Sequence, residues 1–314
     1  MELALLLGAG FSKWSVDLPV APQLFDFEVK PWGVRENQRL STLRSLKQQW
    51  DRSRPGGLAE QFAADLLDSS TQDRQLLLWY LARRLSEPFI WEEFHAGRWR
   101  RHVLMIDEKR ATSQPGVVSA RDFLRRFPQS LMQGIITPNY DMVIEYALGT
   151  KGFHYGVPGQ RLTGRGPYPV STWRNPVRLT GPTPLAKIHG SISWDESERY
   201  TDGRRGLTGN ALIVAPTPEK AVPHSLKDVW NLAERILLNA KGLVVFGFAF
   251  NPYDEALLSL LRVAKDIELV LLIDIQDNTQ AAHVVWPHAT ISWAKPPPAG
   301  DSTIYNWQNA CVRT

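Results

Sequence analysis

Short apolar runs of strand length recur along the chain and predict the strands of a sheet. An unbroken apolar run is typical of a strand buried on both faces, as in a parallel sheet. The predicted strands cover residues 3–7, 134–136, 185–188, 211–214, 242–246 and 268–273, with a further candidate at 289–293. Lys187 and Glu268 are the charged residues within these segments. Helical spacing of apolar residues follows several of them, near 142–146, 227–240 and 253–264. This alternation favours an α/β fold with a Rossmann-like, mostly parallel sheet flanked by helices.

The pattern changes after the first strand, where apolar residues take up a helical period. Leu40, Leu43, Leu46 and Trp50 fit one helix, and two similar groups follow. We interpret residues 36–126 as an inserted helical module, and residues 1–35 with 127–314 as the Rossmann-like domain. Residues 14–34 and 151–183, which hold several prolines and glycines, are expected to be irregular.

Composition narrows the class of protein. The 314 residues are 43% hydrophobic and 22% charged, as is ordinary for a soluble globular protein. A net charge of +4 does not indicate nucleic-acid binding without a local basic patch. The single cysteine, Cys311, excludes an internal disulfide and a four-cysteine zinc site, and it fits a reducing cytoplasm. We see no signal peptide and no apolar segment of about 20 residues, so a cytoplasmic protein without a membrane span is expected.

Polar residues stand directly after the apolar run at 134–136. Thr137, Pro138, Asn139, Tyr140 and Asp141 place an amide, a phenol and a carboxylate at the end of a predicted strand. Ligands of open α/β sheets bind at the carboxyl ends of the strands. Because Asn and Asp also favour turns, the segment on its own fits a plain turn equally well.

A glycine turn follows the first predicted strand. Gly8, Ala9 and Gly10 make half of a dinucleotide-binding fingerprint, in which backbone N–H groups approach a pyrophosphate, and Ser12 adds a hydroxyl. Lys13 stands where the third glycine belongs, which disfavours an ordinary hydride-transfer dehydrogenase. Taken alone, the glycines also fit a tight turn.

Three further strand ends carry candidate groups. His189, before Gly190, has the chemistry of a general base near neutral pH, although a lone histidine is more often structural. Gly247 opens space where a buried strand meets a helix, and Asp254 fits the first turn of that helix with or without a ligand role. Asp274 ends the next strand, where an acidic residue can hold ribose hydroxyls.

In this order the motifs resemble those of the sirtuin superfamily, in its bacterial sirtuin-like branch. The matching segments are Gly8-Ala9-Gly10-Phe11-Ser12, Thr137-Pro138-Asn139-Tyr140-Asp141, Lys187-Ile188-His189-Gly190-Ser191 and Gly247-Phe248-Ala249-Phe250 with Asp254. The helical module and the last 40 or so residues match no motif.

Departures from the family pattern shift the expected chemistry. Protein deacylases of the family carry a four-cysteine zinc module, which a chain with one cysteine cannot form. Pro138 and Tyr140 replace the Gln and Ile of the deacylase pattern, and the Tyr form resembles the branch that hydrolyses NAD in bacterial anti-phage defence. Ala249 stands where a phosphate-contacting Ser is common.

The resemblance implies an NAD hydrolase that cleaves the nicotinamide–ribose bond without a metal. Asn139, His189 and Asp141 are then the catalytic residues: Asn139 orients water or a ribose hydroxyl, His189 accepts a proton, and Asp141 contacts the carboxamide or supports the site electrostatically. The cofactor-binding residues implied are Gly8, Ala9, Gly10, Ser12, Tyr140, Gly247 and Asp274.

The sequence also fits other functions. The chief alternative is a non-catalytic NAD- or ADP-ribose-binding module that signals to a partner protein. The missing cysteines disfavour a deacylase. Nucleic-acid binding would have to use the basic cluster at residues 98–102, which is more typical of a solvated face of the helical module. Because a free NAD hydrolase harms its own cell, we expect restraint by a homo-oligomer or a separately encoded regulatory or activating protein.

Overall fold

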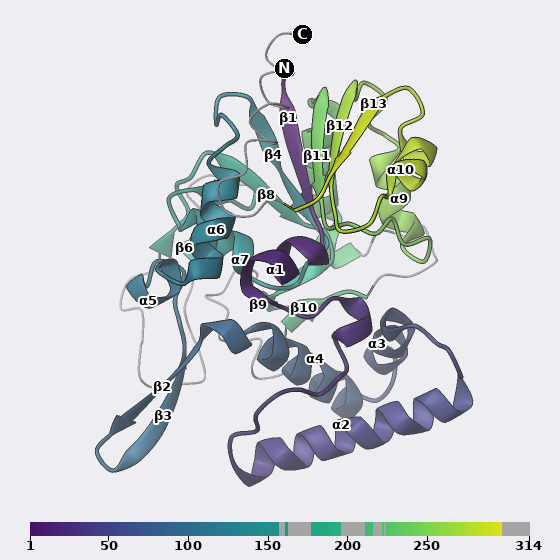
Figure 1. Ribbon diagram of the computed structural model, residues 1–314. Helices are drawn as coiled ribbons and strands as arrows, with labels where there is room; N and C mark the ends of the chain where they lie inside the picture. The colour runs from purple at the N-terminus through teal and green to yellow at the C-terminus, as the bar shows by residue number, and fades with distance from the viewer. Residues whose placement is uncertain (157–160, 163–176, 196–210, 216–221, 223, 297–314) are drawn as a thin grey trace.

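Seven parallel strands form the central sheet of the computed structural model (Figure 1). The structure describes residues 1–156, 161–162, 177–195, 211–215, 222 and 224–296. In spatial order the strands are β13 (Thr290–Ala294), β12 (Leu269–Ile273), β11 (Gly242–Phe246), β1 (Leu3–Leu7), β4 (Met132–Thr137), β8 (Thr183–Lys187) and β5 (Phe153–His154). The predicted Rossmann-like fold class is confirmed.

The central strands are buried because both of their faces are covered. Every residue of β1 and β11 is buried, and Leu5 lies in register with Val244 on one side and Ile135 on the other. The unbroken apolar runs therefore predicted these strands correctly.

The order of the strands creates a topological switch point between β1 and β11. From β1 the chain moves to β4 and β8 on one side, then returns to β11 on the other side and continues to β12 and β13. Crevices at such a switch point are where open α/β sheets bind ligands.

Helices cover both faces of the sheet. α1 (Ala9–Val16) contacts α6 (Pro115–Leu124), which contacts α7 (Val143–Leu148), while α8 (Lys227–Leu238) packs on β4 and β8. α9 (Glu255–Leu261) and α10 (Thr279–Val285) accompany β12 and β13 (Figure 1). Neither α10 nor the extent of α1 was predicted, and α6 packs on the sheet domain although its residues lie within the predicted helical module.

The helical module lies beyond the carboxyl ends of the strands (Figure 1). It contains α2 (Gly33–Ser53), α3 (Ala59–Leu67) and α4 (Thr71–Leu85), held together by apolar side chains such as Leu40, Leu43 and Phe62. α4 contacts a small antiparallel sheet of β9 (Gly190–Asp195) and β10 (Ala211–Ile213). The module is thereby brought against the edge of the sheet where ligands are expected. The division into two domains at 36–126 stays a prediction.

A β-hairpin interrupts the segment that was expected to be helical. β2 (Ile90–His95) pairs with β3 (Arg98–Val103), and the hairpin projects from the body of the molecule (Figure 1). The turn residues Ala96 and Gly97 both have positive φ, 49° and 77°, as the commonest two-residue hairpin turns require. The cluster at residues 98–102 is therefore part of a strand, and the helical interpretation was wrong here.

Shorter elements complete the described part of the chain. They are the 3-10 helices η1 (Ala21–Gln23), η2 (Glu87–Phe89) and η4 (His224–Leu226), the helix α5 (Lys109–Thr112), and the two-residue strands β6 (Arg161–Leu162) and β7 (Val177–Arg178). Most of the predicted loop at 151–183 lies outside the described residues. In the described ranges, no helix is both long and apolar enough to cross a membrane.

Candidate functional site

The predicted site residues lie at one edge of the sheet. Parallel strands place their carboxyl ends together, and each candidate follows one of five neighbouring strands. The segments are Gly8–Ser12 after β1, Asn139–Asp141 after β4, His189 after β8, Gly247 after β11 and Asp274 after β12.

The two glycine turns pack backbone against backbone at the switch point. A Cβ atom added to Gly8 would lie 2.3 Å from the Gly247 carbonyl oxygen, and one added to Gly10 would lie 2.6 Å from the Gly247 Cα. The Gly10 N–H donates to the Gly247 carbonyl at 3.0 Å, and the Gly8 N–H donates to the Phe246 carbonyl at 2.8 Å. The glycines thus permit a close approach of two turns, and both N–H groups are already used.

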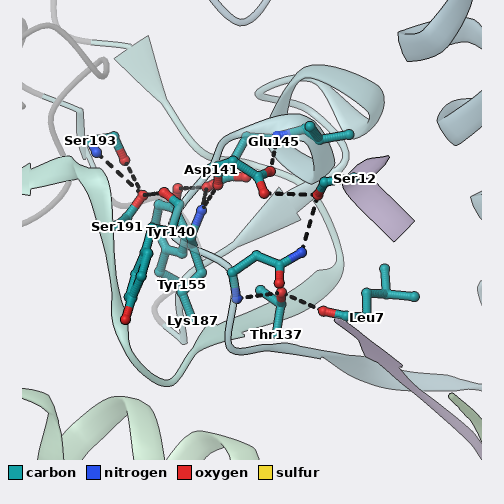
Figure 2. Close-up of polar contacts among 12 residues, drawn as sticks. Leu7, Ser12, Thr137, Tyr140, Asp141, Glu145, Tyr155, Lys187, Ser191 and Ser193 are labelled. Atoms are coloured by element: carbon teal, nitrogen blue, oxygen red, sulfur yellow. Dashed lines mark hydrogen bonds and ion pairs between the residues drawn. The ribbon is translucent and has the colours of Figure 1, made fainter. Parts of the chain in front are cut away.

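The amide of Asn139 is fixed by two acceptors from the β1–α1 segment. Its Nδ2 donates to the Gly8 carbonyl at 2.8 Å and to the Ser12 Oγ at 3.1 Å. Ser12 in turn donates its hydroxyl proton to Asp141 Oδ2 at 2.8 Å (Figure 2). Because the Ser12 proton goes to Asp141, its oxygen is free to accept from Asn139, and the orientation of the amide follows.

The fixed amide leaves the carbonyl oxygen of Asn139 as an acceptor. No hydrogen bond to this Oδ1 is found among the described residues. The segment is also anchored through Thr137, whose hydroxyl donates to the Leu7 carbonyl at 2.6 Å and accepts from the Asn139 N–H at 3.1 Å (Figure 2). Asn139 is therefore held rigidly with its acceptor available.

Asp141 is a buried carboxyl that joins two helices. Its Oδ1 accepts from the Val143 N–H at the start of α7, at 2.9 Å, while its Oδ2 accepts from Ser12 in α1. Burial raises the pKa of the Asp141 carboxyl above its ordinary value; Lys187 and the hydrogen bonds from Val143 and Ser12 act in the opposite direction.

A buried ion pair lies behind this carboxyl. Lys187, at the end of β8, and Glu145, in α7, have fully buried side chains, and Lys187 Nζ lies 2.8 Å from Glu145 Oε1. Lys187 also donates to the Asp141 carbonyl, and the Tyr155 hydroxyl donates to Glu145 Oε1 at 2.9 Å (Figure 2). The pair ties β8 to the segment after β4, a role that sequence reasoning did not assign.

The His189 imidazole lies beside the carboxylate of Asp254, a contact that was not predicted. Its Nε2 lies 3.2 Å from Asp254 Oδ2, and only 5% and 8% of the two side chains are exposed. Asp254 also caps α9, accepting from the Leu257 N–H at 3.3 Å. The sequence offered only the capping position as a signal, because nothing in a linear pattern pairs a residue that follows β8 with the residue that caps α9.

Tyr140 and Asp274 each have a hydrogen-bond partner. The Tyr140 hydroxyl donates to the Val214 carbonyl at 3.1 Å, and burial, followed by the carboxylates of Asp254 and Glu60, raises the pKa of the phenol. Asp274 Oδ1 accepts from the Gln276 N–H at 3.2 Å in the turn after β12.

The helical module reaches the site through α3. Glu60 Oε1 accepts from Asn251 Nδ2 at 3.2 Å, and Asn251 lies in the loop that leads to Asp254. Among the described residues, no three His, Cys, Asp or Glu side chains gather so as to hold a metal ion.

Comparison with known proteins finds likeness only among solved structures, one of which is described below. No family model and no curated protein matches the chain. A crystal structure of Sir2 in complex with the inhibitor EX-527, 2′-O-acetyl-ADP-ribose and a deacetylated p53 peptide is similar at 14% identity and a TM-score of 0.40, over 100% of this chain and 95% of that chain. A likeness at this level assigns no residue and no activity, so the sirtuin-like motifs and their anti-phage branch stay a prediction.

Proposed function

We propose that this protein is an NAD⁺ hydrolase, which cleaves the nicotinamide–ribose bond to give nicotinamide and ADP-ribose. The observation that carries the proposal is the gathering of two glycine turns, the Asn139 amide and the His189 imidazole at the carboxyl edge of one parallel sheet. Its switch point is the place where such sheets bind nucleotides.

The pyrophosphate is assigned to the first turn of α1. This turn, formed by Gly8, Ala9, Gly10 and Ser12, holds no acidic residue and presents the positive end of the helix dipole. Since the N–H groups of Gly8 and Gly10 are engaged, the Ala9 N–H is the donor we assign to a phosphate oxygen. Gly247 lies beside this turn.

The remaining predicted ligand contacts surround the two riboses. Asp274, two strands from β1, is assigned to the adenosine ribose, as acidic residues at strand ends commonly are. Tyr140 is assigned to the nicotinamide half, between Asn139 and Asp141. These assignments rest on position along the sheet edge.

Cleavage of the nicotinamide–ribose bond depends on stabilisation of positive charge more than on acid catalysis. Cleavage passes through an oxocarbenium-like state, and nicotinamide leaves as a neutral molecule. Asn139 Oδ1, with its amide group held from behind, accepts a hydrogen bond from the attacking water or a ribose hydroxyl. His189 takes up the proton. Asp141 supports the site by holding Ser12, and through it Asn139.

We further propose that the enzyme is a restrained effector, in keeping with an anti-phage role. Uncontrolled hydrolysis would exhaust the NAD of its own cell, so a second copy or a separate regulatory protein must hold it inactive. The helical module supports this proposal, because it contacts β9 and β10 through α4 and the site loop through Glu60.

The test is a measurement of nicotinamide release from NAD by the purified chain, alone and with the products of neighbouring genes. Asn139→Ala and His189→Ala should each abolish turnover while the fold stays intact, which circular dichroism checks. Asn239→Ala and His283→Ala make the same chemical changes at exposed positions and should leave turnover unchanged.

Two results would count against hydrolysis. Unchanged turnover in both site variants would remove the assignment of catalytic residues. Tight NAD binding without nicotinamide release, in the presence of every candidate partner, would identify the alternative, a non-catalytic binding module.

A further inference from the structure

We propose that Asp254 is a positioning residue that keeps His189 in the tautomer with its proton on Nε2, so that Nδ1 is the nitrogen that takes up a proton. The catalytic use of Nδ1 rests on the proposed function. The tautomer itself follows from the contact and can be tested without turnover.

The contact is built from rigid parts on both sides. Asp254 is fixed by its Oδ1, which caps α9, and by its own N–H, which donates to the Asn251 carbonyl at 3.0 Å. The backbone around His189 is fixed as well, because its carbonyl accepts from the Val214 N–H at 3.0 Å and the preceding carbonyl accepts from the Trp230 indole at 2.8 Å. The cap bond therefore holds the Asp254 carboxylate in place, and the backbone bonds hold the Cα of His189 beside it.

The chemistry of the two groups decides where the proton lies. A carboxylate attracts an N–H group and repels a nitrogen lone pair, so a neutral imidazole whose Nε2 lies 3.2 Å from Asp254 Oδ2 is more stable with its proton on Nε2. Its lone pair is then on Nδ1.

Proton transfer through His189 balances the overall reaction. NAD⁺ and water give nicotinamide, ADP-ribose and one proton. The C1′–nitrogen bond breaks with its electron pair on nicotinamide, and a new C1′–oxygen bond forms to water. The proton lost by the water passes to His189 Nδ1 and then to solvent, while Asp254 remains a carboxylate throughout.

The variant Asp254→Asn tests this role alone, because the hydrogen bond that caps α9 fixes the orientation of the new amide. The asparagine oxygen takes the Oδ1 position and accepts from the Leu257 N–H, since asparagine is as good a helix N-cap as aspartate. Its NH₂ group then faces His189 Nε2 and donates to it. The imidazole is forced into the opposite tautomer, with its proton on Nδ1.

The experiment is ¹⁵N NMR of histidine side chains in the full chain, combined with the rate of nicotinamide release. The protein has seven histidines, so the signal of His189 is assigned by its loss in His189→Gln. Wild type should show the proton on Nε2, and Asp254→Asn should show it on Nδ1. Nicotinamide release should fall roughly 10³- to 10⁴-fold, as expected when a base is held in the wrong tautomer.

Two further variants separate positioning from folding. Asp277→Asn makes the same change at an exposed aspartate, which accepts from the Thr279 N–H at 2.9 Å, and it should alter neither tautomer nor rate. Asp254→Ser keeps a capping side chain but offers no carboxylate to His189, so it should lose rate while the melting temperature stays near wild type.

The two readouts fail independently. A wild-type proton on Nδ1, or the same tautomer in wild type and Asp254→Asn, would overturn the positioning role whether or not NAD is hydrolysed. If the tautomers are as expected but no NAD is cleaved under any condition, the proposed function fails and the structural role of Asp254 stands.

Discussion

Replacing Ser12 with alanine removes one hydroxyl that serves two buried groups. The hydroxyl donates to Asp141 Oδ2 at 2.8 Å and accepts from Asn139 Nδ2 at 3.1 Å. Its loss leaves one acceptor and one donor without a partner, in a place where only 2% of Ser12 is exposed. An unsatisfied buried group costs about 1–3 kcal/mol.

Two such groups cost about 2–6 kcal/mol, and about 0.5 kcal/mol is recovered because alanine favours the helix, so the expected destabilisation is about 1.5–5.5 kcal/mol. Nicotinamide release should fall roughly 10- to 100-fold, because the Asn139 amide keeps only its bond to Gly8 and a small misplacement of a reacting group slows catalysis by such factors. Urea unfolding gives the first quantity, and a turnover assay gives the second.

Ser15→Ala is the matched control, since it makes the same change in the same helix. The Ser15 hydroxyl makes only a 3.4 Å contact to the Ser12 carbonyl, so its loss should change the unfolding free energy by about 0.5 kcal/mol or less. Equal unfolding free energies for the Ser12 and Ser15 variants would refute the network as the anchor of Asn139.

Three further predictions concern the surroundings of the site. Gly247→Ala should lower the unfolding free energy in urea by about 2–4 kcal/mol, because φ is +61° and a Cβ atom would overlap the facing turn. Gly33→Ala, at φ +78° with open space around it, measures the backbone strain alone, at about 1–2 kcal/mol. Equal losses in the two variants would contradict the close packing of the turns. Burial raises the pKa of Asp141, so the stability that its protonated carboxyl contributes is present at low pH and is lost as the pH rises above about 4, the ordinary value for Asp. The unfolding free energy of Asp141→Asn minus that of wild type should therefore increase as the pH rises from about 4, and a flat difference would contradict it. Lys187→Met should lower the unfolding free energy by about 3–5 kcal/mol, because it leaves the buried Glu145 carboxylate without its partner, and adding Glu145→Leu should restore most of that loss. A double variant as unstable as Lys187→Met would show that the unpaired carboxylate does not cause the loss.

The sheet could be predicted from the sequence because a strand that is buried on both faces needs apolar residues along its whole length. The apolar runs at 3–7 and 242–246 correspond to β1 and β11 without a shift. The carboxyl edge could be inferred too, since polar residues follow those runs directly. In contrast, β3 carries three arginines around a single tryptophan on a largely exposed hairpin, without a continuous apolar run. The turn of this hairpin depends on the φ angles of Ala96 and Gly97, which composition does not reveal.

The contacts within the site could not be predicted in the same way. Ser12 and Asn139 are separated by 127 positions, and Lys187 and Glu145 by 42. Only the order of the strands brings such residues together. Asp254 had a sufficient local explanation as a helix cap, and that explanation concealed its second contact.

The order of strands also governs when the site can exist during synthesis. β1 is made first, but one of its two neighbours, β11, begins only at Gly242, and Asp254 follows later still. Contacts between distant segments close large loops and form slowly. A nascent or truncated chain that ends before β11 lacks both the Gly247 turn and the carboxylate beside His189. Incomplete copies of the protein therefore have no assembled site, whatever reaction the complete site performs.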